Sequence, residues 1–208
     1  RDPSGDGFRR RRIGVGLPPV VIASRPAPYS DALVDKHGRR LRKLRISLTE
    51  ACNLRCVYCM PEHATFAHRD ELLAPTEIVD IVSDLAELGI EAVRITGGEP
   101  TLRAEFPEIA RRICEIPALK VGLTTNGWRL SEHATSLAKW GMHGVNVSLD
   151  SLDADNFRRM ARGGDLGQVL SGIRAARDAG LVVKINTVVM RGLNDHELEA
   201  FHDFALLE

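Results

Sequence analysis

Hydrophobic and polar residues alternate in five short stretches after residue 40, and a segment with helical spacing follows each stretch. The alternation predicts strands and the helical spacing predicts helices. The predicted strands cover residues 43–48, 92–96, 120–124, 144–148 and 181–189. The predicted helices cover residues 75–88, 105–116, 131–140, 166–179 and 195–207. This order is typical of parallel βα units, so we expect an α/β fold. A full barrel of eight units needs roughly 200–250 residues, so we expect a partial (β/α) barrel of about five units, with an open doubly wound sheet as the alternative.

Each predicted strand has one apolar face and one polar face. Strands of a parallel sheet that is buried on both faces are normally apolar throughout, so this alternation is informative. The polar faces carry three cations, Arg45, Arg94 and Lys184. Buried polar groups need partners, so the sequence predicts a polar cavity suited to an anionic substrate. The alternative is a hydrated interior with internal salt bridges.

The composition is that of an ordinary globular protein of 208 residues, with 28 Lys and Arg against 28 Asp and Glu. A formal net charge of zero argues against a dedicated nucleic-acid binder, which usually carries a basic excess. No apolar run approaches the ~18 residues of a membrane span. We therefore expect a cytoplasmic protein that contacts neither nucleic acid nor membrane.

The charge is unevenly distributed along the chain. Residues 1–45 hold twelve Lys and Arg against four Asp and Glu, and residues 1–40 hold five of the ten prolines. Such a segment has too little apolar surface to fold alone, so we expect residues 1–40 to be a disordered basic leader. The run Arg9–Arg12 before a short apolar stretch also leaves a twin-arginine export signal as an alternative.

Three of the four cysteines form one tight motif directly after the first predicted strand. Cys52, Cys56 and Cys59 have Cys-x₃-Cys-x₂-Cys spacing, whereas Cys114 lies alone in a helical segment. A tight cluster of three favours metal over disulfides. It fits an iron–sulfur cluster with one open iron, or a zinc site with His63 as the fourth ligand. Cys114 is interpreted as a small buried hydrophobic residue.

A second motif, Gly97-Gly98-Glu99-Pro100, follows the second predicted strand. Paired glycines let the backbone approach a ligand closely, because no side chain intervenes. Glu99 adds a carboxylate that could accept a hydrogen bond from an ammonium group. The glycine pair alone is weak evidence for a ligand site. The evidence is stronger here because the pair follows the βα unit that carries the cysteine motif.

The two motifs together resemble those of the radical S-adenosylmethionine (SAM) enzymes. More narrowly, the chain resembles the GTP 3′,8-cyclases of molybdenum cofactor biosynthesis. The stretches that carry this narrower resemblance are KLRISLT (43–49), VRITGGEPTL (93–102), LTTNG (123–127), VNVSLDSL (145–152) and KINTVVMRGLND (184–195). The resemblance covers about residues 38 to 208, and it implies the TIM-type barrel of the radical SAM core over residues 41–208.

This resemblance implies a specific chemistry and a role for each matching residue. Cys52, Cys56 and Cys59 would hold a 4Fe-4S cluster whose open iron chelates SAM. The matching SAM-contacting positions are Tyr58, Gly98, Thr124 and Ser148. The matching triphosphate-binding positions are Arg45, Arg94 and Lys184, the same cations that the strand pattern assigns to the cavity. Reductive cleavage of SAM would give a 5′-deoxyadenosyl radical that converts GTP to (8S)-3′,8-cyclo-7,8-dihydroguanosine 5′-triphosphate.

The resemblance also shows where this chain departs from the family. The family places a second 4Fe-4S cluster in a C-terminal region, and this sequence has no second three-cysteine motif. We therefore expect a truncated core that does not complete GTP cyclisation. Position 92, often lysine in the family, is Ala92 here, so a phosphate contact is expected to be lost.

The expected partners are GTP and a low-potential electron donor, and the resemblance is compatible with a homodimer. The alternatives are a peptide-modifying radical SAM maturase and a zinc-stabilised binding module.

Overall fold

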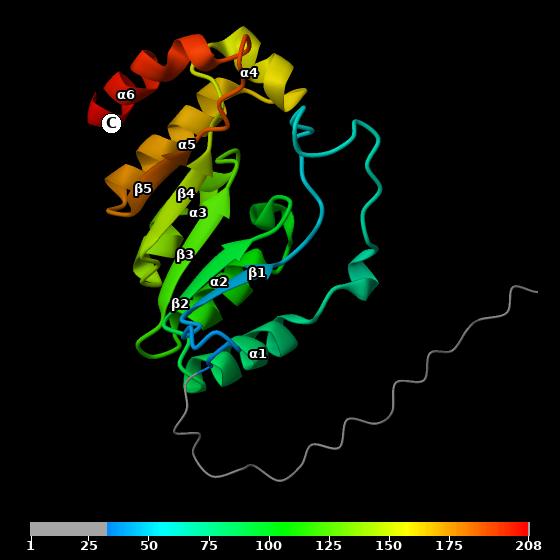
Figure 1. The fold of residues 1–208 in the computed structure, drawn as a ribbon, viewed down its shortest axis with the longest axis vertical. Coiled ribbons are helices and arrows are strands. Elements are labelled where there is room, and N and C mark those ends of the chain that lie inside the picture. Colours follow the sequence, from blue (N-terminus) through cyan, green and yellow to red (C-terminus); the bar gives the residue numbers. More distant parts are fainter. Residues whose placement is uncertain (1–32, 208) are drawn as a thin grey trace, which may run out of the picture. The chain divides into compact units, whose positions relative to one another are not determined.

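The structure is a computed structural model that describes residues 33–207. Its centre is a five-stranded parallel sheet with the strand order β1-β2-β3-β4-β5 (Figure 1). The strands are β1 (Lys43–Ser47), β2 (Ala92–Thr96), β3 (Lys120–Thr125), β4 (Gly144–Ser148) and β5 (Val182–Asn186). The helices are α1 (Pro75–Glu87), α2 (Phe106–Cys114), α3 (Leu130–Lys139), α4 (Ala154–Ala161), α5 (Leu166–Asp178) and α6 (Leu198–Leu207). Short 3₁₀ turns lie at Arg69–Glu71, Pro100–Leu102 and Asp195–Glu197.

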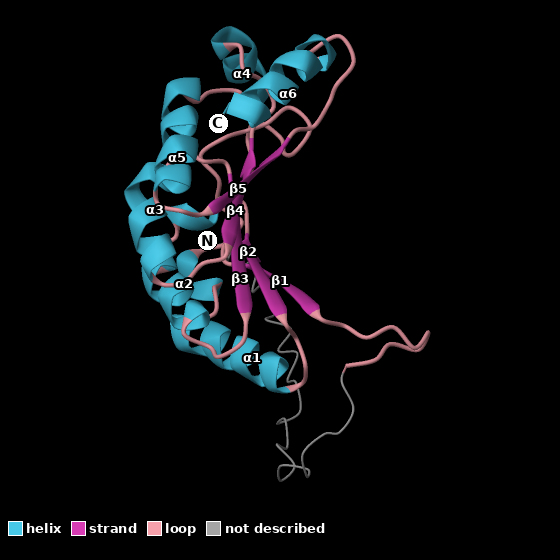
Figure 2. Ribbon diagram, turned by 90° about the vertical axis from the view of Figure 1, so that its left-hand side faces the viewer, coloured by secondary structure: helices cyan, strands magenta, loops and turns pink. Residues whose placement is uncertain are grey.

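Helices α1, α2, α3 and α5 lie along one face of the sheet (Figure 2). The core between the two layers is apolar because the alternating strands place Ile95, Leu123 and Val147 on this side, where they are fully buried. The opposite face carries the polar residues of each strand. This arrangement confirms the α/β fold and the partial barrel. A doubly wound sheet would have helices on both faces.

The structure differs from the predicted elements in two places. Strand β5 is shorter than expected, because residues beyond Asn186 turn towards the end of β4: Thr187 Oγ1 donates to the Leu149 carbonyl at 2.8 Å. Helix α4 was not predicted. Half of its eight residues are polar, and its buried residues are Asn156, Phe157, Met160 and Ala161. An Asp153 side chain begins the helix by accepting from the Asn156 amide at 2.7 Å.

Most of the predicted leader, up to residue 32, lies outside the described residues. Its last residues form a turn in which Val34 pairs with Arg40 and the Leu41 amide donates to the Leu33 carbonyl at 2.7 Å. The Leu33 amide in turn donates to Leu88, at the end of α1. Over residues 33–207, no helix is long and apolar enough to cross a membrane.

Candidate functional site

The cysteine loop, residues 49–59, follows the carboxyl end of β1. Cys52 and Cys56 are half-buried, Cys59 is exposed, and all three thiols are free. The carboxyl ends of parallel strands form one edge of the sheet, where loops from several βα units meet. The loops after β2, β3 and β4 all contribute residues that contact this loop.

Helix α4 supports the cysteine loop through its last two backbone carbonyls. The Val57 amide donates to the Met160 carbonyl at 2.9 Å, and the Arg55 amide donates to the Ala161 carbonyl at 3.0 Å. Leu54 is buried and lines a small cavity with Phe157. The unpredicted helix is therefore part of the platform that positions the cysteines.

Gly97 and Gly98 bring the end of β2 into direct contact with the beginning of the cysteine loop. The Gly98 amide donates to the Thr49 carbonyl at 2.7 Å, and the Glu99 amide donates to the Ala51 carbonyl at 2.8 Å. A Cβ atom at Gly98 would lie 2.5 Å from the Ala51 carbonyl oxygen. Such a contact is too close for any side chain, so this approach requires glycine.

The carboxylate of Glu99 is completely buried and is used by the protein itself. Its oxygens accept hydrogen bonds from the Thr101 amide, the Thr101 hydroxyl, the Thr125 hydroxyl and the Asn126 amide, at 2.6–3.1 Å. The expectation that Glu99 accepts from a ligand ammonium is therefore wrong. Glu99 instead ties the end of β2 to the end of β3.

Cys52 Sγ has the N–H donors expected of a cluster ligand. The Leu54 amide donates to Cys52 Sγ at 3.4 Å and Asn126 Nδ2 donates to it at 3.9 Å. Burial raises the pKa of Cys52 despite these donors, and burial, the charge of Asp150 and the neighbouring sulfurs raise the pKa of Cys56 to about 11. Bound iron offsets such costs by stabilising thiolates, and N–H donors to sulfur tune a cluster's potential. The residues therefore fit a 4Fe-4S cluster.

A site for a single metal ion has less support. Over residues 33–207, no three His, Cys, Asp or Glu side chains converge as ligands of one ion do. Zinc needs its ligands about 2.0–2.3 Å from a single point, whereas a cluster of four irons holds its thiolates farther apart. The zinc alternative with His63 has no support from this part of the chain.

Tyr58 is anchored across the site by Asp150, which lies just beyond β4. The Tyr58 hydroxyl donates to Asp150 Oδ2 at 2.5 Å, and the Val188 amide donates to Oδ1 at 2.9 Å. Burial and the Asp150 carboxylate raise the pKa of Tyr58. Tyr58, Cys56 and Ser148 line the same small cavity, of about 30 Å³. Two of the predicted SAM-contacting residues therefore lie beside a predicted cluster ligand.

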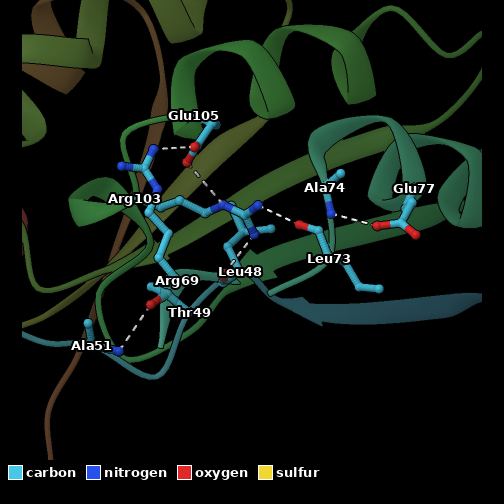
Figure 3. A network of polar contacts seen from close by, with 9 residues as sticks. All are labelled: Leu48, Thr49, Ala51, Arg69, Leu73, Ala74, Glu77, Arg103 and Glu105. Carbon is cyan, nitrogen blue, oxygen red and sulfur yellow. Dashed lines mark hydrogen bonds and ion pairs between the residues drawn. The ribbon is translucent and has the colours of Figure 1, made fainter. Parts of the chain in front are cut away.

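Arg103 joins the two ends of the segment that carries the cysteines (Figure 3). Its guanidinium donates to the Leu48 carbonyl at 2.9 Å and to the Leu73 carbonyl at 2.5 Å. It also pairs with Glu105 at 3.4 Å, and Arg69 pairs with the same carboxylate. The side chain of Arg103 is only 7% exposed. A buried guanidinium therefore closes the long loop between β1 and α1.

A cavity of about 380 Å³ opens on the polar face of the sheet, over the amino-terminal halves of the strands. Its polar lining consists of Lys43, Arg45, Arg94, Lys120, His143, Asn146 and Lys184. None of the described residues that line it is an Asp or a Glu. The structure thus brings together Arg45, Arg94 and Lys184. None of these described residues forms an ion pair, so the alternative of internal salt bridges has no support here.

Arg94 is the most enclosed of these cations. Its guanidinium lies over Gly122, where a Cβ atom would be 2.7 Å from Nη1, and it donates to the Leu123 carbonyl at 3.1 Å and to Asn146 Oδ1 at 3.2 Å. Burial and the positive charge of Arg45 lower the pKa of Arg94. Thr124 lies on this same face of β3, between the cavity and the cysteine loop, with Asn146 as its partner in β4.

Sequence reasoning missed several residues of the two sites. Asp150 and Asn126 follow β4 and β3, and their place at the carboxyl ends of strands was the available signal. His143 is exposed and lines the cation cavity. His133 packs edge-on against Phe106, with ring centroids 5.2 Å apart. Helical spacing alone did not show that His133 faces the core.

Comparison with known proteins points to one family. The sequence profile of the radical SAM superfamily matches residues 46–205. A GTP 3′,8-cyclase of Synechocystis sp. is 46% identical over 178 residues, which cover 86% of this chain and 54% of that protein. One from Marinobacter nauticus is 46% identical over 174 residues, 83% of this chain and 53% of that protein. The chain thus spans about half the length of the curated relatives it matches.

Solved structures with the same fold are more distant in sequence. Streptococcus suis SuiB bound to its precursor peptide SuiA superposes with a TM-score of 0.70 at 19% identity, over 80% of this chain and 37% of that one. Native anSMEcpe with bound AdoMet and the Kp18Cys peptide superposes with a TM-score of 0.61 at 18% identity, over 79% of this chain and 49% of that one. At this level of identity, the likeness supports the fold alone.

Proposed function

The chain belongs to the radical SAM superfamily, and we propose that it is the SAM-cleaving part of a GTP 3′,8-cyclase, a lyase of molybdenum cofactor biosynthesis. Membership of the superfamily implies a 4Fe-4S cluster and bound SAM. The substrate of the proposed reaction is GTP, and its product is (8S)-3′,8-cyclo-7,8-dihydroguanosine 5′-triphosphate.

The cation cavity is the observation that carries the choice of substrate. Arg45, Arg94 and Lys184 line it without a carboxylate, so their charges lack compensation within the cavity. Arginine and lysine are the usual partners of phosphate groups. A nucleoside triphosphate supplies the several negative charges that such a cavity favours, and the relatives named GTP 3′,8-cyclase supply the guanine.

The residues around the cysteine loop would bind SAM and keep water away from it. Cys52, Cys56 and Cys59 would hold the cluster, and Tyr58, Gly98, Thr124 and Ser148 would contact SAM. When bound, the cluster and SAM supply a carbon radical that removes a hydrogen atom from the substrate. The chain itself contributes positioning: Asp150 fixes the Tyr58 hydroxyl at 2.5 Å, and Arg94 is fixed by Asn146 at 3.2 Å.

The proposal extends to partners and location. A low-potential electron donor would reduce the cluster, and a homodimer is compatible with the family. A second 4Fe-4S cluster, expected in the family, would need cysteines beyond the four present here. A reducing compartment such as the cytoplasm suits three thiols that must stay free to hold iron.

The experiment is anaerobic reconstitution with iron and sulfide, followed by two separate assays. We expect a brown protein that releases 5′-deoxyadenosine from SAM under reduction, but no cyclised nucleotide from these 208 residues alone. We also expect it to bind GTP. A colourless protein with stoichiometric zinc would contradict the radical SAM assignment of this site.

Substitutions separate the cyclase from a peptide-modifying maturase. Arg45→Gln should weaken GTP binding about tenfold, since it removes a charge from the cavity. Arg42→Gln is the matched control, because Arg42 lies just before β1 and pairs with Glu91 at 3.6 Å outside the cavity. Equal GTP affinity in the parent and both variants would favour the maturase.

A further inference from the structure

We infer that Lys43 and Lys120 form a second phosphate-binding pair in the cation cavity, which holds the terminal phosphate of the nucleoside triphosphate. The inference rests on the proposed function for the identity of the nucleotide. It adds two residues to the three cations that the resemblance assigns, and it revises the expected loss of a phosphate contact at Ala92.

Strand register puts the two lysines on either side of Ala92. Ala92 in β2 is paired with Lys43 in β1 and with Lys120 in β3, so the three residues form one row across the sheet. Neighbouring strands lie about 4.8 Å apart, which separates the two lysine backbones by about 10 Å. The small side chain of Ala92 leaves the space between them open. Two long lysine side chains can therefore converge on one anion above Ala92.

The row lies one layer farther from the cysteine loop than the row of Arg45 and Arg94. Lys43 precedes Arg45 by two residues on the same strand face, which corresponds to about 7 Å along the strand. The cysteine loop follows the opposite, carboxyl end of β1. A chain of phosphates that runs along the strands away from the cysteines meets Arg45 and Arg94 first, and the lysine pair last.

Neither lysine is compensated by the protein. Among the described residues, neither Lys43 nor Lys120 forms an ion pair, and no carboxylate lines the cavity. The nearby acidic residue Glu91 is paired with Arg42 at 3.6 Å. Five Lys and Arg side chains thus share a space of about 380 Å³. Their mutual repulsion falls when a polyanion binds, which favours a triphosphate over nucleotides with fewer phosphates.

The test compares the reconstituted parent with Lys43→Gln, Lys120→Gln and the double variant, by calorimetric titration with inorganic triphosphate, GTP, GDP and GMP. We expect each single change to weaken triphosphate and GTP binding about threefold and the double change about tenfold. GMP binding should change less than twofold. The losses should shrink at high salt, because exposed charges are screened.

Lys139→Gln is the matched control, since Lys139 is an exposed lysine at the end of α3, away from the cavity. Ala92→Lys added to the double variant should restore most of the lost affinity, because it returns a charge to the middle of the same row. Unchanged affinities in the double variant, or an equal loss in the control, would overturn the inference.

A comparison of ATP with GTP in the same titrations separates this inference from the proposed function. Equal affinity for ATP and GTP, with both dependent on the two lysines, would support the lysine pair and contradict the choice of GTP. A preference for GTP that does not depend on the lysines would support the cyclase and overturn the pair.

Discussion

Glu99 shows how a single buried carboxylate can organise two loops. Four protein donors surround its oxygens, and they come from the loop after β2 and the end of β3. One of these donors, the Asn126 amide, belongs to the residue whose side chain reaches Cys52 Sγ. The carboxylate therefore acts on the cysteine loop indirectly, by positioning Asn126.

Glu99→Gln should lower the free energy of unfolding by roughly 1–3 kcal/mol, because the amide group presents N–H atoms to donors that need an acceptor. Denaturant titration of the cluster-free protein measures this loss. Glu62→Gln, at an exposed position just after the cysteine loop, serves as the control and should change stability by less than about 0.5 kcal/mol. A loss in the control as large as that in Glu99→Gln would contradict the argument.

His133 makes the stability of the protein depend on pH. Its Nε2 is buried without a hydrogen-bond partner, and burial together with the charge of Arg129 lowers its pKa, while Glu132 acts in the opposite direction. A histidine with a lowered pKa stabilises the fold above its ordinary pKa, and this contribution is lost as the pH falls below it.

Unfolding in urea at about pH 7.5 and about pH 5.5, on either side of the ordinary histidine pKa, tests this expectation. The parent should lose more stability on acidification than His133→Leu, which cannot be protonated. His37→Gln, in an exposed turn, should behave as the parent does. If His133→Leu loses as much stability as the parent, burial does not govern this titration.

At the scale of elements, the sequence predicts the repeated βα units well and the inserted helix poorly. The five strands alternate apart from an adjacent apolar pair at the start of β2 and of β5. Glycines such as Gly89, Gly141 and Gly180 mark the ends of three helices. Helix α4 has only eight residues. It supports the cysteine loop through the carbonyls of Met160 and Ala161, and the pattern of hydrophobic residues does not reveal such backbone contacts. The same limit applies to β5, which ends early because Asp150 and Leu149 bind residues 187 and 188.

Phe157→Ala should loosen α4 and, with it, the cysteine loop. Phe157 is almost completely buried, so its truncation should cost roughly 3–5 kcal/mol. Hydrogen exchange reports the coupling: the Arg55 and Val57 amides, which donate to α4, should lose protection more than the Leu48 amide, which donates to Thr96. Equal loss at all three amides would indicate general destabilisation instead.

At the scale of the whole described chain, the sequence predicts the faces of the sheet but not the ties between loops. Strand parity correctly assigned Arg45, Arg94 and Lys184 to one face, because a period of two needs no knowledge of tertiary structure. Lys43 and Lys120 lie on that face too, but their common row becomes visible only with the strand register. Arg103 joins Leu48 to Leu73, a contact between distant segments that local patterns do not encode.

Arg103→Gln should therefore release both ends of the segment that carries the cysteines. The loss of a buried guanidinium from two carbonyls and a carboxylate should cost roughly 2–4 kcal/mol. We also expect a lower iron content after reconstitution, measured per polypeptide. Arg111→Gln, which breaks only the exposed pair with Glu115 at 2.6 Å, should leave both quantities nearly unchanged. A full iron content in Arg103→Gln would show that the loop holds its shape without this tie.

The position of the cations at one end of the strands and of the cysteines at the other has a consequence for selectivity. In the proposed complex, the phosphates are held at a fixed depth in the sheet, and each pair of residues along a strand corresponds to about 7 Å. The length of the strands then fixes the distance between the bound phosphates and the cysteine loop. This distance selects the hydrogen atom of the nucleotide that lies next to the cysteine loop. A nucleotide with one phosphate fewer, bound by its terminal phosphate, would therefore place a different atom there.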